Sequence, residues 1–209
     1  MKTGWLIPCV LGALGLFLAR FSGDGSPGFY ALTAATAFVY AAGWWIWGDR
    51  NAFAGPGEDL DAGTGREISR GIFMGAALAL VFVAGAVVVQ FIPFLADPVA
   101  ELLDTPSTGG LAPTLFVLII NGIGEELVYR DMVPNQLRGR HSEVAVGVIS
   151  TLIYCVVTVA MGVPLLVFAA GVLGAVAFYE ASRSRRLYSP IAVHLTWSIT
   201  MLVVMPAFF

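Results

Sequence analysis

Seven apolar stretches, each of about the length that crosses a lipid bilayer, constrain the fold of this chain more than any other feature. A membrane-spanning helix needs about 20 mostly apolar residues, with a range of about 17 to 25. Give or take a few residues, the stretches cover 4–19, 28–48, 71–95, 112–134, 144–161, 163–181 and 190–208. The sequence therefore predicts an all-α fold, a polytopic transmembrane helical bundle of about seven spanning helices.

The composition agrees with a membrane protein and excludes one class of partner. Hydrophobic residues make up 58% of the chain and charged residues 12%, against about 45–50% and about 25% in soluble domains. The net charge of −3 at pH 7 leaves no basic surface for nucleic acid. Cys9 and Cys155 lie in apolar runs without CxxC spacing and behave there as small hydrophobic side chains. The lipid bilayer is the first partner that we expect.

The basic residues predict an orientation. Seven helices place the N-terminus and the loops 49–70, 135–143 and 182–189 on one side of the membrane, and nine of the eleven Lys and Arg residues lie on that side. The opposite side carries only Arg20. Because Lys and Arg are enriched in cytoplasmic loops, we expect a cytoplasmic N-terminus and a C-terminus on the outer side. We expect the membrane to be the cell membrane, that is, the plasma or inner membrane.

Two connections divide the chain. The loop 49–70 is polar and glycine-rich, which favours a solvated cytoplasmic connection. The connection 96–111 is expected to form an amphipathic turn or two at the outer surface, with Asp97 as the N-cap and Pro98 at the first helical position. We expect residues 1–111 to hold three transmembrane helices and residues 112–209 to form a core of four.

The segment NGIGEELVYRDM, residues 121–132, places charges directly behind an apolar run. If the fourth helix ends near residue 134, Glu125 lies about 13 Å inside it, and an acidic residue near a helix centre costs roughly 2.5 to 3.5 kcal/mol. A structural ion pair between Glu126 and Arg130, four residues apart, is one explanation. It leaves Glu125 unexplained, so a functional site with Glu125 as general base is the other.

Two other helices offer partners at a similar depth. His194 and Ser198 share one face of the last helix. Tyr154 and Thr158 continue a polar seam on the fifth helix, where such hydroxyls more often serve contacts between helices than catalysis. A lone histidine near a membrane boundary is more often structural, but the acidic pair favours a shared site.

The motif EELVYR resembles the EExxxR motif of the CAAX-protease and bacteriocin-processing family of polytopic membrane proteins. The stretch from LLVFAAGVLGAVAF to SPIAVHLTWS is similar to that family's Gly-xx-Gly helix, short basic loop and histidine helix. The resemblance covers about residues 112–205, and it implies a CAAX-prenyl-endopeptidase-like core.

The resemblance also implies roles for individual residues. Members with known activity are glutamate-dependent intramembrane peptidases, so Glu125 resembles the base, Glu126 and Arg130 its supports, and His194 the histidine that stabilises the oxyanion. Two positions of this chain depart from the pattern. The FxxxH motif reads Tyr154 and Thr158, and the HxxxN motif ends in Ser198. No cofactor is expected, and no metal either, because HExxH is absent and adjacent glutamates diverge around a helix.

Two classes of function follow from these motifs. The first is a non-catalytic accessory subunit that binds another membrane protein or a lipid. The second is an active endopeptidase that cuts a membrane-bound peptide near the cytoplasmic leaflet. Two of three motifs are altered, and loss of one oxyanion donor typically costs about a hundred- to a thousandfold in rate. The sequence alone therefore favours the accessory subunit, since a fold does not carry a function by itself.

Overall fold

The computed structural model describes residues 3–54 and 60–209, and this part of the chain is helical throughout. Its only β-type pairing is an isolated bridge between Arg138 and His141. The α-helices are α1 (Ile7–Phe21), α2 (Pro27–Trp47), α3 (Leu60–Val89), α4 (Pro93–Leu103), α5 (Thr105–Gly109), α6 (Leu111–Glu126), α7 (Val133–Leu137), α8 (Glu143–Thr158), α9 (Pro164–Ser184) and α10 (Tyr188–Val204). Short 3₁₀ turns extend α1, α8 and α10, and a π-helical turn, Leu127–Met132, joins α6 to α7.

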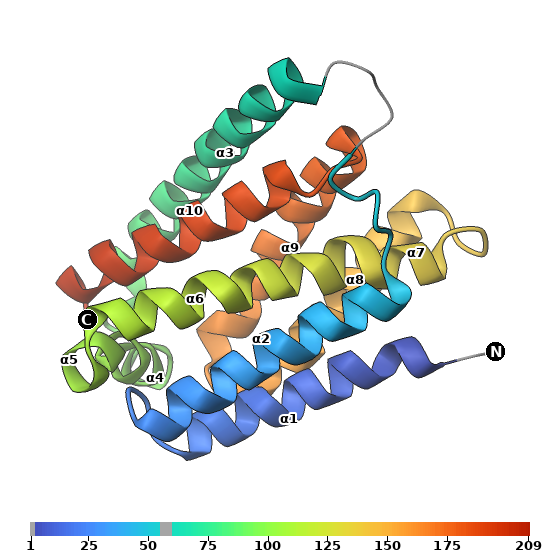
Figure 1. The fold of residues 1–209 in the computed structure, drawn as a ribbon. Helices are drawn as coiled ribbons and strands as arrows, with labels where there is room; N and C mark the ends of the chain where they lie inside the picture. The colour runs from blue at the N-terminus through green and yellow to red at the C-terminus, as the bar shows by residue number, and fades with distance from the viewer. Residues whose placement is uncertain (1–2, 55–59) are drawn as a thin grey trace.

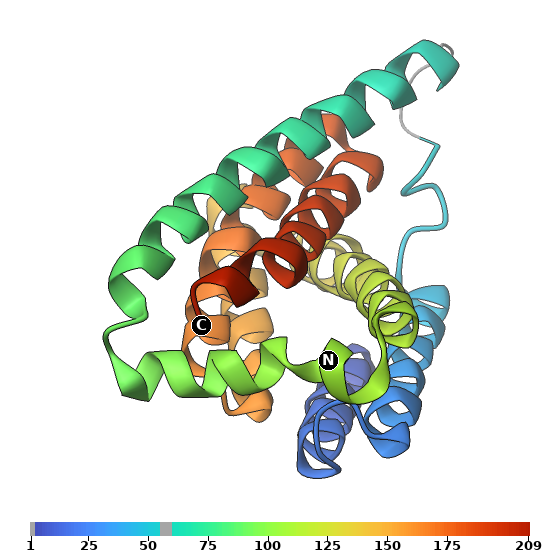
Figure 2. The ribbon, with the colours of Figure 1, turned by 90° about the vertical axis from the view of Figure 1, so that its left-hand side faces the viewer.

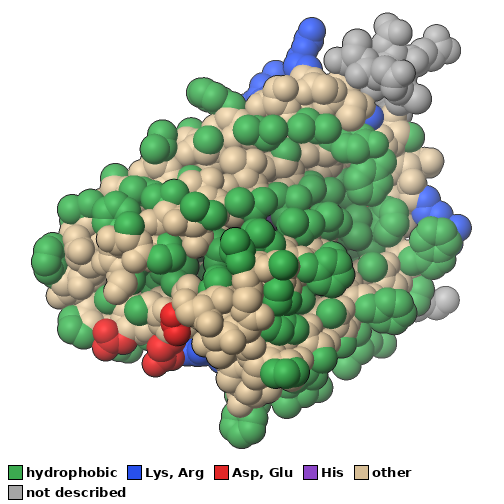
Figure 3. Space-filling model, turned by 60° about the vertical axis from the view of Figure 1, so that its left-hand side comes forward, with side chains coloured by type: hydrophobic (Ala, Val, Ile, Leu, Met, Phe, Trp, Pro, Cys, Tyr) green, Lys and Arg blue, Asp and Glu red, His purple; other side chains and the backbone are tan. Residues whose placement is uncertain are grey.

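Seven helical segments of the described residues are long and apolar enough to cross a membrane, which confirms the predicted polytopic bundle. Six of them match the predicted stretches to within a few residues, and one of these, Leu111–Leu137, combines α6, the π-helical turn and α7. Hydrophobic side chains are spread over the whole face shown in Figure 3, and the charged side chains lie near its edges, as expected for a surface in contact with lipid.

The third span differs from the prediction. Helix α3 begins at Leu60, so much of the predicted loop 49–70 is helical, and it ends at Val89 rather than at residue 95. Residues 55–59 of that loop lie outside the described part. Apolar length marks only the section of a helix inside the hydrocarbon region, whereas tertiary contacts stabilise its polar turns. The Arg70 guanidinium donates to the buried Glu180 carboxylate of α9 at 2.8–3.0 Å.

The connection after α3 also differs. Helix α4 begins at Pro93, so the prediction of Asp97 as N-cap and Pro98 at the first helical position was wrong. Pro93 occupies the first turn, where the missing N–H would have had no helical partner, and Pro98 lies inside the helix. Figure 2 shows α4 and α5 crossing one end of the bundle, between the end of α3 and the start of α6.

The bundle has two ends of different character (Figure 1). One end holds the start of α1, the end of α2, α7 and the turn between α9 and α10, and most of the described arginines lie there; we call it the basic end. The other holds α4, α5, the turn between α1 and α2, and the C-terminus; we call it the α4 end. Helix α6 runs towards the basic end and α10 runs back from it.

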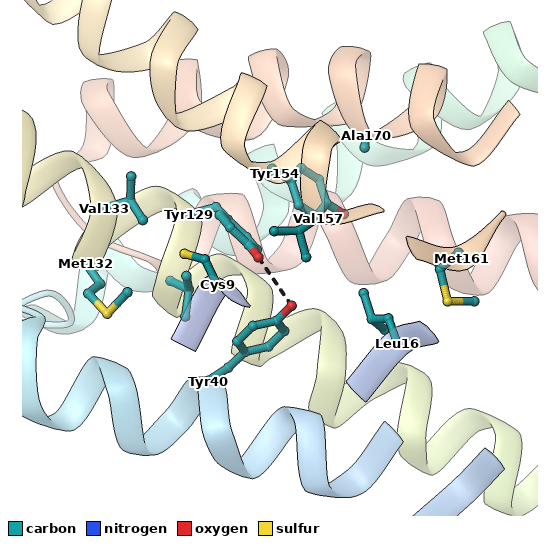
Figure 4. Close-up of a cluster of buried hydrophobic side chains, with 11 residues drawn as sticks. Cys9, Leu16, Tyr40, Tyr129, Met132, Val133, Tyr154, Val157, Met161 and Ala170 are labelled. Atoms are coloured by element: carbon teal, nitrogen blue, oxygen red, sulfur yellow. Dashed lines mark hydrogen bonds between the residues drawn. The ribbon is translucent and has the colours of Figure 1, made fainter. Parts of the chain in front are cut away.

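A cluster of aromatic side chains packs around the π-helical turn (Figure 4). Tyr40 of α2 and Tyr129 of the turn are fully buried, and their hydroxyls lie 3.2 Å apart. The ring of Tyr129 lies 4.8 Å from that of Tyr154 of α8. Gly12 lets α1 approach this cluster, since a Cβ there would lie 2.3 Å from the Tyr40 hydroxyl. These contacts fix the position of the turn that follows the acidic pair.

Candidate active site

The acidic pair ends helix α6, and the chain then widens into the π-helical turn. All six residues of the turn, Leu127–Met132, are buried. Single π turns inside α-helices are rare and occur frequently at functional sites. Here the turn returns the Arg130 side chain to Glu126, with Nε 3.1 Å from Oε2 and both side chains fully buried. The predicted ion pair is therefore present.

Glu125 is 8% exposed, and both oxygens of its carboxylate accept hydrogen bonds. Asn121, one turn earlier on α6, donates from Nδ2 to Oε1 at 2.7 Å. The Tyr154 hydroxyl of α8 donates to Oε2 at 2.6 Å. Hydrogen bonds to an ionised acceptor are shorter and stronger than neutral ones. The two donors therefore hold the Glu125 carboxyl group in a fixed orientation.

His194 of α10 lies between the two glutamates. Its Nδ1 is 2.7 Å from Oε1 of Glu126, and its Nε2 is 3.7 Å from Oε2 of Glu125. A carboxylate paired with Arg130 can only accept, so we assign the proton to Nδ1. In the neutral ring, Nε2 then has a free lone pair beside Glu125. Glu126 and Arg130 thus orient the imidazole, and the imidazole faces Glu125.

Arg130 carries the positive charge nearest to this group. The Tyr154 ring faces its guanidinium, with the ring centroid 4.9 Å from Cζ. Its contact with Glu126 is an ion pair rather than a well-aligned hydrogen bond, and its Nη atoms have no hydrogen-bond partner within the described residues. A buried guanidinium between a carboxylate and an aromatic face is stabilised by charge and by the ring quadrupole.

The altered motif positions behave differently from one another. Tyr154 contributes its hydroxyl to Glu125, as described above. The Thr158 hydroxyl donates to the Tyr154 carbonyl at 2.9 Å, which satisfies a backbone acceptor rather than the carboxylates. Ser198 lies one turn after His194, and its hydroxyl forms no hydrogen bond with any described residue. The structure thus brings Glu125, Glu126, Arg130, His194 and Tyr154 together, and leaves the two smaller hydroxyls at the edge.

A cavity of about 270 Å³ adjoins Glu125 and His194 on the side of the α4 end. Its walls come from α4, α5, the first half of α6 and the second half of α10, among other elements, and they are mostly apolar. A separate hollow of about 570 Å³ lies at the basic end, where Arg130 and Asp131 line it. No residue lines both. Fully buried Glu126 lines neither.

Three polar residues of this region are not among the predicted site residues. Asn121 could have been found from its spacing, because it lies four residues before Glu125. Asp131 accepts from Trp44 Nε1 and from the Asp49 amide, both at 2.7 Å, and so fixes the end of α2. Trp197 lines the cavity one turn after His194. Within the described residues, no group of three His, Cys, Asp or Glu side chains is placed to hold a metal ion.

A comparison with protein families matches residues 107–200 to the model described as "Rce1-like: Type II CAAX prenyl endopeptidase Rce1-like". The match covers just under half of the chain, from α5 to α10, and includes the acidic pair and His194. No curated protein and no solved structure matched the chain. The family match and the seven spanning helices agree with the sequence motifs. The chain is therefore an integral membrane protein whose residues 107–200 are similar to the Rce1-like CAAX prenyl endopeptidase family.

Proposed function

We propose that this protein is a glutamate-dependent intramembrane endopeptidase, with Glu125 as the general base. The observation that carries the proposal is the arrangement of Glu125, held by two hydrogen-bond donors, beside Nε2 of an oriented histidine at one end of a mostly apolar cavity. An oriented base next to a space for substrate is what general-base hydrolysis requires. The accessory function that the sequence favours does not require an oriented histidine beside Glu125.

The proposed reaction begins with a water molecule that bonds both Glu125 Oε2 and His194 Nε2. Glu125 takes one proton from the water as its oxygen attacks the substrate carbonyl carbon, and the carbonyl electron pair moves to the oxygen. Collapse of the tetrahedral intermediate breaks the C–N bond, and Glu125 returns the proton to the leaving nitrogen. Glu126 and Arg130 do not touch the substrate, and act by fixing the orientation of His194.

Tyr154 is the residue that makes activity compatible with the altered motifs. The related motif has phenylalanine at this position and histidine four residues later. Here the phenol hydroxyl lies 2.6 Å from Glu125 and so brings an O–H donor to the site that phenylalanine lacks. Once Glu125 has taken the proton from water, this hydroxyl is free to donate to the substrate oxyanion, and donors placed where charge develops stabilise the transition state. We propose that Tyr154 takes over part of the role of the missing imidazole.

A second candidate is a non-catalytic membrane subunit that binds another membrane protein. Two observations favour it: both Glu125 oxygens already have partners, and Thr158 is bonded to the backbone. In that case the buried charges hold the helices in register, and the cavity binds without cleaving.

Cleavage of membrane-bound peptides by the purified protein in lipid nanodiscs separates the two candidates. Glu125→Gln keeps the side-chain size and should lower product formation about a hundred- to ten-thousandfold. Glu180→Gln is the matched control, because Glu180 is also buried and is bonded to Arg70 and Ser189 outside the site. An unchanged set of products from Glu125→Gln, measured by mass spectrometry, excludes Glu125 as the base. A complex with a membrane protein that survives this substitution, without any cleavage by the wild type, supports the second candidate.

A further inference from the structure

We propose that the cavity beside Glu125 binds an extended apolar peptide segment that reaches it from the α4 end, and that Asn121 and Trp197 bind one backbone peptide group of that segment. This assignment deepens the proposed endopeptidase function by naming the class of substrate, the direction of access and two residues for recognition. Binding of the peptide can also be measured in a protein that does not cleave it.

The cavity wall selects an uncharged occupant. Apart from Glu125 and His194 at the inner end, its lining contains no charged side chain. Apolar residues such as Phe82, Val117 and Met201 form most of the wall. Because a charged group would lose its hydration there without gaining a partner, charged side chains are excluded. The walls therefore fit either an apolar peptide or a hydrocarbon chain.

Two buried polar atoms distinguish between these occupants. Asn121 Oδ1, an acceptor, and Trp197 Nε1, a donor, have no hydrogen-bond partner among the residues that the structure describes. Both side chains line the cavity. Buried polar atoms are normally satisfied by protein or by a bound molecule. A peptide group carries one N–H donor and one C=O acceptor and so complements this pair, whereas a hydrocarbon chain offers neither.

The position of these atoms predicts where the bound peptide group lies. Asn121 is four residues before Glu125 on α6, and Trp197 is three residues after His194 on α10. The two helices run in opposite directions, so both steps lead towards the α4 end. The steps are about 6 Å and about 4.5 Å along the helix axes, or roughly two residues of extended chain. The anchored peptide group should therefore lie about two residues from the bond that is cut.

The direction of access follows from what closes the other side. The hollow at the basic end and the cavity share no lining residue, and buried Glu126 and Arg130 lie beside Glu125 towards the basic end. At the α4 end, by contrast, the wall includes Val99, Leu102 and Leu103 of α4. Helix α4 is one of the two short helices that cross this end of the bundle (Figure 2). An apolar segment is thus expected to pass beside α4 to reach Glu125.

Binding is tested with the Glu125→Gln protein in nanodiscs, so that no probe is consumed. The probe is a fluorescent, uncharged, apolar ten-residue peptide, compared with a fatty acyl chain of equal length that carries the same dye. Trp197→Phe removes the Nε1 donor and keeps the ring-shaped side chain, and it should weaken peptide binding about two- to tenfold, the value of one hydrogen bond. Trp45→Phe is the matched control, since Trp45 is 59% exposed.

Two further measurements locate the peptide. Replacing single peptide N–H groups of the probe with ester oxygens should weaken binding at one position only, and this effect should disappear in Asn121→Leu. Leu102→Trp fills the cavity from α4 and should abolish binding, whereas Leu80→Trp, at a side chain 71% exposed on α3, should not.

Three results overturn the inference: the acyl probe binds as tightly as the peptide, the ester series shows no preferred position, or Leu102→Trp leaves binding unchanged. Peptide binding with all the expected variant effects, but no cleavage by the wild type, overturns the proposed endopeptidase and supports this inference. If the protein still cleaves peptides with Leu102→Trp in place, the proposed endopeptidase is supported and this inference is overturned.

Discussion

Removal of one oxygen atom, in Tyr154→Phe, tests the mechanism most directly. The substitution restores the aromatic residue of the related motif, and the ring can keep its contacts with Tyr129 and Arg130. What is lost is the 2.6 Å hydrogen bond to the Glu125 carboxylate. In the proposed mechanism the hydroxyl donates to the substrate oxyanion once Glu125 is protonated. A hydrogen bond to a charged group contributes about 1.5–3 kcal/mol, and each 1.36 kcal/mol corresponds to about tenfold in rate. We therefore expect cleavage to slow by about ten- to 150-fold.

The matched control is Tyr40→Phe. Tyr40 belongs to the same cluster and loses a hydrogen bond too, but its partner is the neutral Tyr129 hydroxyl at 3.2 Å (Figure 4). It should lower thermal stability by about 0.5–1.5 kcal/mol and leave the rate per folded molecule nearly unchanged. Rates are measured by mass spectrometry on nanodisc samples, with the folded fraction from thermal unfolding. If Tyr154→Phe cleaves at the wild-type rate, the hydroxyl has only a structural role and the proposed replacement of imidazole is refuted.

Three further predictions address the altered motif, the packing and the orientation. Thr158→His returns an imidazole to the cavity and should raise cleavage by up to about a hundredfold; no increase over wild type in the same peptide assay would show that the missing imidazole does not limit the rate. Gly12→Ala places a Cβ 2.3 Å from a tyrosine hydroxyl of α2 and should cost about 1–3 kcal/mol in thermal unfolding, whereas Gly85→Ala, with open space around it, should not destabilise. A cysteine introduced at Arg140 should react with a membrane-impermeant thiol reagent only after the cells are opened. A cysteine introduced at Asp97 should react in intact cells. The reverse pattern would show that the orientation in the membrane is opposite to the predicted one.

The sequence predicted the parts of the fold that depend on local pattern. Apolar length located the seven spans, and four-residue spacing predicted the ion pair between Glu126 and Arg130. The depth of Glu125 and His194 on separate helices also led to the correct expectation that they would lie close together. Each of these inferences rests either on spacing within one helix or on the depth of a residue in the bilayer. None of them requires knowledge of how the helices pack against one another.

What the sequence could not predict depends on contacts between distant segments. The polar turns of α3 continue as helix because Arg70 reaches Glu180, 110 residues away. The hydroxyl of Tyr154 reaches Glu125 because the π-helical turn and the aromatic cluster set the rotation of α8 against α6. The spacing of residues along the sequence predicts neither contact. Each contact joins two helices whose rotation relative to one another is fixed only when the core has assembled.

The π-helical turn separates two rotational registers along one continuous span. Residues up to Glu126 are phased to face α8 and α10, and residues from Asp131 onwards are phased to face α2. An extra residue in the turn supplies the offset of about 100° between these two phases. A one-residue deletion within Leu127–Met132 would therefore leave a regular α-helix, with the acidic pair and the residues behind the turn on their present faces, and would remove only the widened turn between them.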